Sequence, residues 1–333
     1  MIEAPPRAGQ RQIRPANLDA VKLYTDGLLC SEIRGGTAIP MKTRLDLSDV
    51  ALCAADSANV ELTKRALELS MERCAFGDAI MFSDAAVHGA FRTIKIEKID
   101  SIADYQSVRL RILPKLIDAP FALFVEWDGY VIEPRAWTPD FRRYDYIGAK
   151  WLQFADGMTI GNSGFCLQSR KLLAALSDPR FTSAGPQNID LLICRTYRPM
   201  LERDYGIRFA PEPVADLFSY ENALPNGPTF GFHGCGNMWR HTEDSEMIRL
   251  VGLVDPYVFR TIHFVRLLAS YFRQRKFVPL EAIYGKMRKH VGREDAAQLF
   301  GRLLRQPVAD QLFSMCEQLL SRPASESVAS PDE

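Results

Sequence analysis

The stretch Phe121-Ala-Leu-Phe-Val-Glu-Trp-Asp-Gly129 decides the fold of this 333-residue chain. An apolar run directly after a proline is typical of a strand that is covered on both faces, as in the middle of a parallel sheet. The run ends in two carboxylates, Glu126 and Asp128, which share one face of an extended backbone. Because open α/β sheets bind ligands at the carboxyl ends of their strands, we expect both acids to face a binding crevice.

The segments on either side of this strand alternate between strand and helix patterns. Before it we expect strands at 50–54, 79–82 and 94–96, and helices at 59–76 and 102–117. After it we expect strands at 144–149 and 206–210, a Gly-rich turn leading into a strand within 161–169, and helices at 170–176 and 188–204. This alternation predicts an α/β fold with a doubly wound, mostly parallel sheet.

Composition divides the chain further. A leader at 1–44 is rich in Pro, Gly and Arg, and is predicted to be flexible. The α/β domain is expected at 45–244, followed by a helical C-terminal extension at 245–321. The polar segment 322–333 is predicted to be a disordered tail.

Bulk properties exclude several classes of protein. A formal net charge of +0 gives no overall attraction to nucleic acid. No apolar run approaches the length of a transmembrane helix, and the seven cysteines lack a C-x-x-C pair, so we expect a cytoplasmic protein. Residues 245–310 carry twelve Lys or Arg against six acids, which indicates a solvated helical surface or, alternatively, a peripheral contact with the inner face of a membrane.

Glu126 and Asp128 are candidate metal ligands. Carboxylate oxygens together with substrate phosphates suit Mg²⁺ or Mn²⁺. The sequence contains neither a G-x-G-x-x-G nor a Walker-type phosphate loop, so phosphates would be held by metal and by cationic side chains. The alternative is that the acids cap a turn, since Asp-Gly is a common turn dipeptide.

Three further motifs have a functional and a structural interpretation. His233, between Phe232 and Gly234, is either a further metal ligand or a structural histidine. Asp190 is either a general base or a first-turn carboxylate stabilised by the helix dipole. A glycine-containing loop either lets a sugar approach the backbone or simply makes a turn; it comprises Gly161, Asn162, Ser163, Gly164 and Phe165. Arg195, Arg198 and Arg203 are expected on a solvated helical face.

Six ordered motifs together resemble the DUF5672 family of glycosyltransferase-like proteins with the GT-A fold. In this chain they are Trp127-Asp-Gly129, Asp145-Tyr-Ile-Gly-Ala-Lys-Trp151, Gly161-Asn-Ser-Gly-Phe-Cys-Leu-Gln-Ser-Arg-Lys-Leu-Leu173, Asp190 with Cys194-Arg195, Ile207-Arg-Phe-Ala-Pro211 and Phe230-Gly-Phe-His-Gly234. They cover roughly 50–235. Two positions depart from the family pattern: Glu126 replaces an aspartate of the metal motif, and Ile189 replaces a glutamate beside Asp190.

The resemblance implies roles for these residues. Asp128 and Glu126 match the metal-binding D-x-D position, His233 the late metal-binding histidine, and Asp190 the acceptor-side base. With Trp127 and Asp128, Asp56 would contact the donor, at its base or ribose. Residues 161–165 would line the acceptor side.

These roles describe a metal-dependent, hexosyltransferase-like enzyme that uses Mn²⁺ or Mg²⁺. It would move a sugar from a UDP- or GDP-sugar to a hydroxyl of a glycan or lipid-linked acceptor, with inversion, in bacterial surface glycan biosynthesis. One alternative is a nucleotide-sugar or glycan-binding module of the same fold without catalysis. A nucleotidyltransferase is disfavoured, because Ala55-Asp-Ser-Ala-Asn59 follows the first strand in place of a Gly-rich basic loop.

Overall fold

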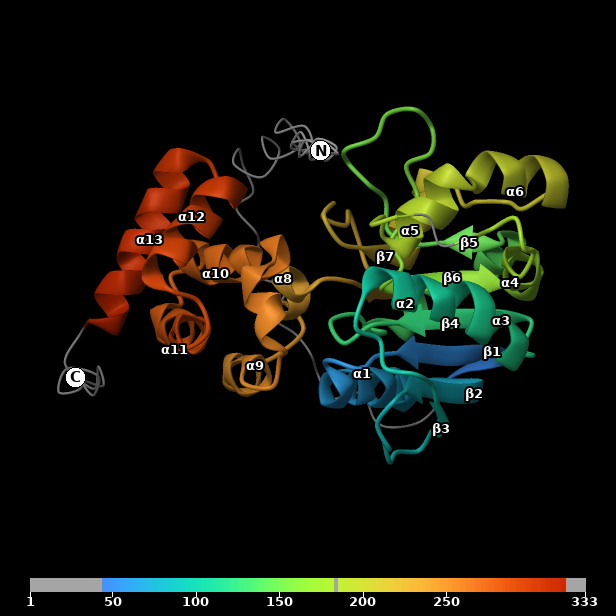
Figure 1. Cartoon of the computed structure of the whole chain (residues 1–333), viewed down its shortest axis with the longest axis horizontal. Coiled ribbons are helices and arrows are strands. Elements are labelled where there is room, and N and C mark those ends of the chain that lie inside the picture. The colour runs from blue at the N-terminus through green and yellow to red at the C-terminus, as the bar shows by residue number, and fades with distance from the viewer. Residues whose placement is uncertain (1–43, 183–184, 322–333) are drawn as a thin grey trace, which may run out of the picture.

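The computed structural model describes residues 44–182 and 185–321. Almost all of the predicted leader, and the predicted tail at 322–333, lie outside these residues. Figure 1 shows a sheet with its covering helices at one end of the molecule and the last helices of the chain gathered at the other end.

A six-stranded sheet with the order β3-β2-β1-β4-β6-β5 forms the centre of the α/β part. Pairs β1–β2, β1–β4 and β2–β3 are parallel, whereas β4–β6 and β5–β6 are antiparallel. The predicted mixed α/β class with a mostly parallel sheet is therefore confirmed. The strands are β1 Leu45–Ala55, β2 Cys74–Ser83, β3 Arg92–Lys95, β4 Phe121–Val125, β5 Tyr146–Ile147 and β6 Phe165–Ser169. A separate two-stranded sheet pairs β7 Ser219–Tyr220 with β8 Gly231–Phe232.

The sheet changes winding direction at β1, which lies between β2 on one side and β4 on the other. Residues 50–54 of β1 and 122–125 of β4 are buried, as expected for covered central strands. Their parallel pairing, with Cys53 opposite Phe124, brings both carboxyl ends to one edge of the sheet. Asp56 and Glu126, which follow these strands, therefore emerge side by side at the position where ligands of such folds bind.

Helices and short turns of helix connect these strands. They are α1 Val60–Arg73, α2 Ile102–Ser107, η2 Val108–Ile112, α3 Leu113–Leu116, η3 Pro134–Ala136, η4 Pro139–Arg143, α4 Arg170–Leu176, α5 Ile189–Leu191, η5 Leu192–Thr196, α6 Arg198–Tyr205 and α7 Glu212–Phe218. Both predicted helices at 102–117 and 188–204 contain a π-helical turn, η2 and η5. Such turns are frequent at functional sites, because they re-aim side chains within a helix.

The prediction of a strand at 206–210 is wrong. The strand predicted at 144–149 is present but shorter, and comprises only β5. Only an isolated bridge joins Tyr146 to Phe209. The carboxylate of Asp145 accepts a hydrogen bond from the backbone of Arg208 at 2.8 Å, and its other oxygen accepts one from Ser169 Oγ at 2.6 Å. The Asp145 side chain thus accepts the N–H of Arg208, which a continued strand would have paired with a backbone carbonyl.

The last part of the chain is helical, as predicted. Its elements are α8 Cys235–Met238, α9 Asp244–Val251, η6 Pro256–Arg260, α10 Ile262–Arg273, α11 Phe277–Arg288, α12 Arg293–Leu303 and α13 Gln306–Leu320. These helices share one hydrophobic cluster with Leu62 of α1 and with Trp127, Tyr130 and Phe232. Burial against the α/β part therefore holds them in place.

The alternative of a membrane contact through residues 245–310 gains no support from this packing. Helix α10 buries Phe264, Val265, Leu268 and Tyr271 inside the protein, so its apolar face is not presented to the surroundings. Within the residues described here, no helix combines the length and the apolar character needed to cross a membrane.

Gly148 is a position where packing tolerates no side chain. A Cβ there would lie 1.8 Å from the carbonyl oxygen of Gly161 and 2.8 Å from that of Asn162. Since both obstacles are backbone atoms, we expect Gly148→Ala to lower the free energy of unfolding by about 1–3 kcal/mol, measured by urea denaturation. Gly227→Ala is the matched control, because a Cβ there meets nothing within 4 Å. Equal unfolding midpoints for the two variants would contradict this account.

Candidate functional site

A cleft of about 750 Å³ opens at the carboxyl edge of the central sheet. Residues 55–58 after β1 and 126–128 after β4 contribute to its lining. The loop before β6 and the start of α5 contribute Ser163 and Asp190, and the C-terminal helices contribute His263. The cleft thus forms where the two parts of the chain meet.

Glu126, Asp128 and His233 form a group that can hold a metal ion. One ligand atom of each residue lies within 4.8 Å of the others. His233 Nε2 is 3.3 Å from Asp128 Oδ1 and 3.5 Å from Glu126 Oε2. The structure therefore brings together the three metal ligands predicted from the sequence, although His233 lies more than 100 residues from the other two along the chain.

The two oxygens of Asp128 have different environments. Oδ2 accepts a hydrogen bond from the backbone N–H of Cys235 at 2.8 Å, which fixes the carboxylate. Oδ1 is buried and accepts no hydrogen bond. Its nearest charged contact is His233 Nε2 at 3.3 Å, and a divalent cation would take up the lone pairs that no hydrogen bond satisfies. The donor set, two carboxylates and one imidazole, also fits Mn²⁺ or Mg²⁺.

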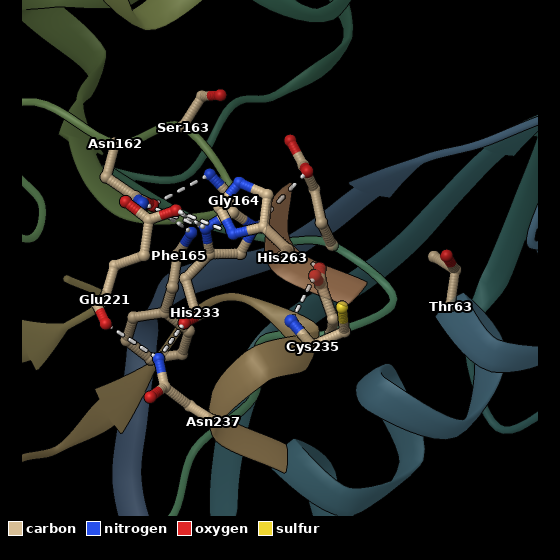
Figure 2. A network of polar contacts seen from close by, with 12 residues as sticks. Thr63, Asn162, Ser163, Gly164, Phe165, Glu221, His233, Cys235, Asn237 and His263 are labelled. Atoms are coloured by element: carbon tan, nitrogen blue, oxygen red, sulfur yellow. Dashed lines mark hydrogen bonds and ion pairs between the residues drawn. The ribbon is translucent and has the colours of Figure 1, made fainter. Parts of the chain in front are cut away.

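Glu221, which sequence analysis missed, completes the surroundings of His233. Its side chain is 9 % exposed, and Oε1 lies 3.4 Å from His233 Nδ1. Metal-bound histidines usually donate their second ring N–H to a carboxylate, which leaves the other nitrogen free for the metal. Figure 2 shows Glu221, His233 and Asn162 turned toward one another, with His263 beside them. Asn162 Nδ2 is 2.9 Å from His233 Nδ1.

Three carboxylates around one imidazole determine the charge of the group. Burial alone would lower the pKa of His233, but Asp128, Glu126 and Glu221 raise it well above its usual value. Burial alone would likewise raise the pKa of Glu221, yet its contacts with His233 and the nearby His263 lower that pKa to about 2. Without a metal, an imidazolium therefore balances the carboxylates, and a divalent cation would displace its Nε2 proton.

Tyr105 and Arg109 fix the side chain of Glu126 through hydrogen bonds. Glu126 Oε1 accepts a hydrogen bond from the Tyr105 hydroxyl at 2.9 Å, and Arg109 Nη1 donates to the same hydroxyl at 3.2 Å. Arg109 is 3 % exposed, and its guanidinium lies 3.8 Å from the centre of the Phe124 ring. This arrangement leaves Glu126 Oε2 directed at His233.

The predicted sugar-facing loop needs a correction. Asn162 and Ser163 line the cleft, whereas Gly161, Gly164 and Phe165 do not. A Cβ at Gly161 would lie 1.9 Å from the Trp151 ring, and one at Gly164 would lie 2.0 Å from His233 Nε2. Phe165 is completely buried in the core. Both glycines make room for protein side chains, so the prediction that they line the acceptor side is wrong.

Asp56 and Trp127, the predicted donor-binding residues, both line the cleft. The carboxylate of Asp56, however, already has partners in the turn before α1 and in α1 itself. Its Oδ1 accepts from the backbone of Ala58 and Asn59 at 2.7 and 2.8 Å, and its Oδ2 accepts from Thr63 Oγ1 at 2.5 Å. These hydrogen bonds explain the acid without a ligand. Trp127 is 9 % exposed and belongs to the hydrophobic cluster of the C-terminal helices.

Asp190 begins α5 and lines the cleft. Its Oδ1 accepts a hydrogen bond from Leu191 N at 2.8 Å, as in the structural interpretation of a first-turn carboxylate. Burial, with a smaller effect of Glu221 and Glu126, nevertheless raises the pKa of Asp190 to about 6. A carboxylate with such a pKa can accept a proton near neutral pH. Ile189 is buried in the core, so it contributes no second acid to the cleft.

Among the residues described, the cleft lining contains no lysine or arginine. The expectation that cationic side chains help to hold phosphates is therefore met only by the two histidines. The predicted arginine face also needs a correction, because Arg195 pairs with Asp156 at 2.7 Å and Arg198 with Glu202 at 2.8 Å, both largely covered. Arg203 alone of the three has a side chain that is mostly exposed, at 69 %.

The first comparison concerns the family. Residues 90–233 match DUF5672, described as a protein of unknown function. The resemblance inferred from the motifs is therefore confirmed for this segment. A search of curated proteins gave no match.

Two solved structures are similar to the chain at low identity. One is mannosyltransferase PcManGT from Pyrobaculum calidifontis in complex with GDP-Man and Mn²⁺, with 11 % identity, coverage of 92 % of this chain and 83 % of that one, and a TM-score of 0.35. The other is A197 from STIV, with 13 % identity, coverage of 49 % and 82 %, and a TM-score of 0.29. At these TM-scores neither similarity carries an argument about this chain.

We expect Tyr105→Phe to weaken Mn²⁺ binding about 10-fold, because Glu126 loses the hydrogen bond that fixes it, as for other residues that orient metal ligands. Isothermal titration with Mn²⁺ measures the change. Tyr284→Phe is the control, since it removes a similar hydrogen bond, 2.6 Å from the Tyr284 hydroxyl to Glu317, far from the cleft. Identical Mn²⁺ affinity of both variants would show that Tyr105 does not position a ligand.

Proposed function

We propose that the protein is a metal-dependent glycosyltransferase of the GT-A type, moving a sugar from a nucleoside diphosphate to an acceptor hydroxyl. The observation that carries this proposal is the group of Glu126, Asp128 and His233, in which the buried Asp128 Oδ1 accepts no hydrogen bond. Its position at the carboxyl edge of a mostly parallel sheet supports the proposal. The match of residues 90–233 to a family whose motifs resemble glycosyltransferases adds to it.

Asp128 Oδ1, Glu126 Oε2 and His233 Nε2 would hold Mn²⁺ or Mg²⁺. When bound, the cation would neutralise the diphosphate and stabilise the charge of the leaving nucleoside diphosphate. No lysine or arginine lines the described part of the cleft, burial lowers the pKa of His263, and the metal would replace the Nε2 proton of His233, so the donor finds no other full positive charge there. Donor binding should therefore depend strictly on the metal.

Asp190 is the proposed general base. In a direct displacement, the acceptor oxygen forms a bond to the anomeric carbon while the bond from that carbon to the diphosphate oxygen breaks. The proton of the acceptor hydroxyl passes to the Asp190 carboxylate, and the bonding electron pair leaves with the diphosphate. The configuration of the sugar inverts. Asn162 and Ser163 border the same side of the cleft and would face the acceptor, which we propose to be a bacterial surface glycan or its lipid-linked precursor.

A nucleotide-sugar or glycan-binding module is the alternative, and one observation favours it. Ile189 is buried in the core where the family pattern has a glutamate, so Asp190 acts without a neighbouring acid. Slow hydrolysis of the donor separates the two functions. A transferase should release free sugar from a UDP- or GDP-sugar in the presence of Mn²⁺, whereas a binding module should release none.

We expect Asp128→Asn to abolish Mn²⁺-dependent binding of UDP- and GDP-sugars, because the amide cannot replace an anionic ligand. Its thermal unfolding should remain close to that of the parent. Calorimetric titration of nucleotide sugars with and without Mn²⁺ measures the loss. Asp118→Asn makes the same chemical change at a side chain that is 96 % exposed, and should bind as the parent does. Equal binding by Asp128→Asn and the parent would reject the metal assignment.

Asp190→Asn should bind the donor with unchanged affinity and lose transfer by at least about 100-fold, the usual contribution of a general base. In the parent, protonation of Asp190 below its pKa of about 6 should remove the base, so the rate should fall about tenfold per pH unit under saturating Mn²⁺. Transfer rates measured from pH 5 to 8 test this. Transfer that persists in Asp190→Asn means that another group takes the proton.

A further inference from the structure

Tyr257 is an exposed aromatic residue inside the cleft. Its side chain is 54 % exposed although it belongs to the lining. Among the described residues, no aromatic ring and no cation contacts its ring. It lies on η6, outside residues 90–233 that match the family.

The backbone of Tyr257 is tied to the start of α1. Asp255 Oδ1 accepts a hydrogen bond from Tyr257 N at 3.0 Å, and Asp255 N donates to Asn59 Oδ1 at 2.8 Å. Asn59 is itself 2 % exposed. The ring is therefore held at a defined place across from residues 55–58, although its side chain is open to solvent.

This end of the cleft is unsuited to phosphate. The Asp56 carboxylate, which accepts the backbone N–H groups of Ala58 and Asn59 just before α1, would repel an anion at this end. Ala55 and Ala58 have short side chains and bear no charge. An exposed aromatic side chain and small residues in the same lining suit a flat, uncharged ring.

The strand order places this end on one side of the metal group. Glu126 follows β4, which lies between β1 and β6. Residues 55–58 follow β1, while Asn162 and Ser163 directly precede β6, whose antiparallel pairing puts Phe165 opposite Val125 at the same edge. A diphosphate held at Glu126 and Asp128 thus has the acceptor side toward β6 and a second side toward β1 and Tyr257.

We propose that Tyr257 is the platform on which the nucleobase of the donor stacks. This inference rests on the proposed function, because a nucleoside diphosphate must occupy the metal group for its base to reach the β1 side. Stacking on a tyrosine ring tolerates any base, so Tyr257 would contribute affinity for the nucleoside and leave the choice of base to other groups.

The test uses the full chain with saturating Mn²⁺ and three probes, UDP, GDP and inorganic pyrophosphate. We expect Tyr257→Ala to weaken binding of the better nucleoside diphosphate about 10-fold and to leave pyrophosphate affinity unchanged. Tyr257→Phe, which keeps the ring, should restore the affinity. Leu253→Ala, at an exposed apolar side chain of the same helical part that does not line the cleft, is the control and should change neither.

Three outcomes overturn the inference. Tyr257→Ala could bind nucleoside diphosphate as the parent does, could lose pyrophosphate to the same extent, or could raise only the KM for an acceptor, which would place an acceptor sugar on the ring. Tyr257→Leu repeats the test if the alanine variant unfolds. If the parent protein binds pyrophosphate with Mn²⁺, the metal assignment stands even when the Tyr257 variants refute base stacking. A parent that binds none of the three probes refutes the proposed function as well.

Discussion

The contact of His233 with Glu126 and Asp128 is the interaction on which the site depends. It connects the residues that follow β4 to the residue that follows β8, and both segments line the cleft. With Glu221 on its other side, the imidazole lies among three largely buried carboxylates. Removing the imidazolium without supplying a metal would leave buried carboxylates uncompensated and cost several kcal/mol, about 3–5 in measured cases. The fold therefore needs a cation here, either the imidazolium or a metal ion.

This requirement extends to residues that bind nothing themselves. Gly164 has no side chain because His233 Nε2 occupies the space, and the backbone carbonyl of Gly164 accepts the N–H of Glu126 at 2.9 Å. Cys235, at the start of α8, fixes Asp128 through its N–H. Since α8 belongs to the same hydrophobic cluster as α9–α13, the geometry of the metal group depends on packing of the C-terminal helices. Those helices belong to the site although the family match ends before them.

Sequence patterns could predict those parts of the site that sit beside a regular element. Glu126 and Asp128 follow an apolar strand, and His233 lies in a motif with aromatic and glycine neighbours. The sequence therefore indicated both where these residues lie in the fold and that they can bind a metal. Glu221 and Tyr257 could not be found this way, because no periodic pattern leads to them and only tertiary packing brings them to the cleft. Tyr105 and Arg109 resemble ordinary residues of an amphipathic helix, and the π-helical turn η2, which includes Arg109, leaves no clear signal in composition.

The wrong predictions have a common physical cause, which is competition by a side chain for a backbone group or for space. The strand expected at 206–210 failed because Asp145 bonds the N–H of Arg208. The sugar-facing role of Gly161 failed because Trp151 needs the room. In both cases the partner lies ten or more residues away in the sequence, so local propensity contains no information about it.

The charged side chains that line the cleft also constrain the order in which a metal ion and a donor can bind. Two histidines face six acids along its lining: Asp56, Asp100, Glu126, Asp128, Asp190 and Glu221. A diphosphate entering this cleft without a metal would meet uncompensated like charges, each costing about 4 kcal/mol at 4 Å with an effective dielectric constant near 20. Such repulsion is comparable to much of the binding free energy of a typical small ligand. In the proposed reaction the cation would therefore enter before the donor or together with it, and the metal group would be the electrostatic condition for donor binding.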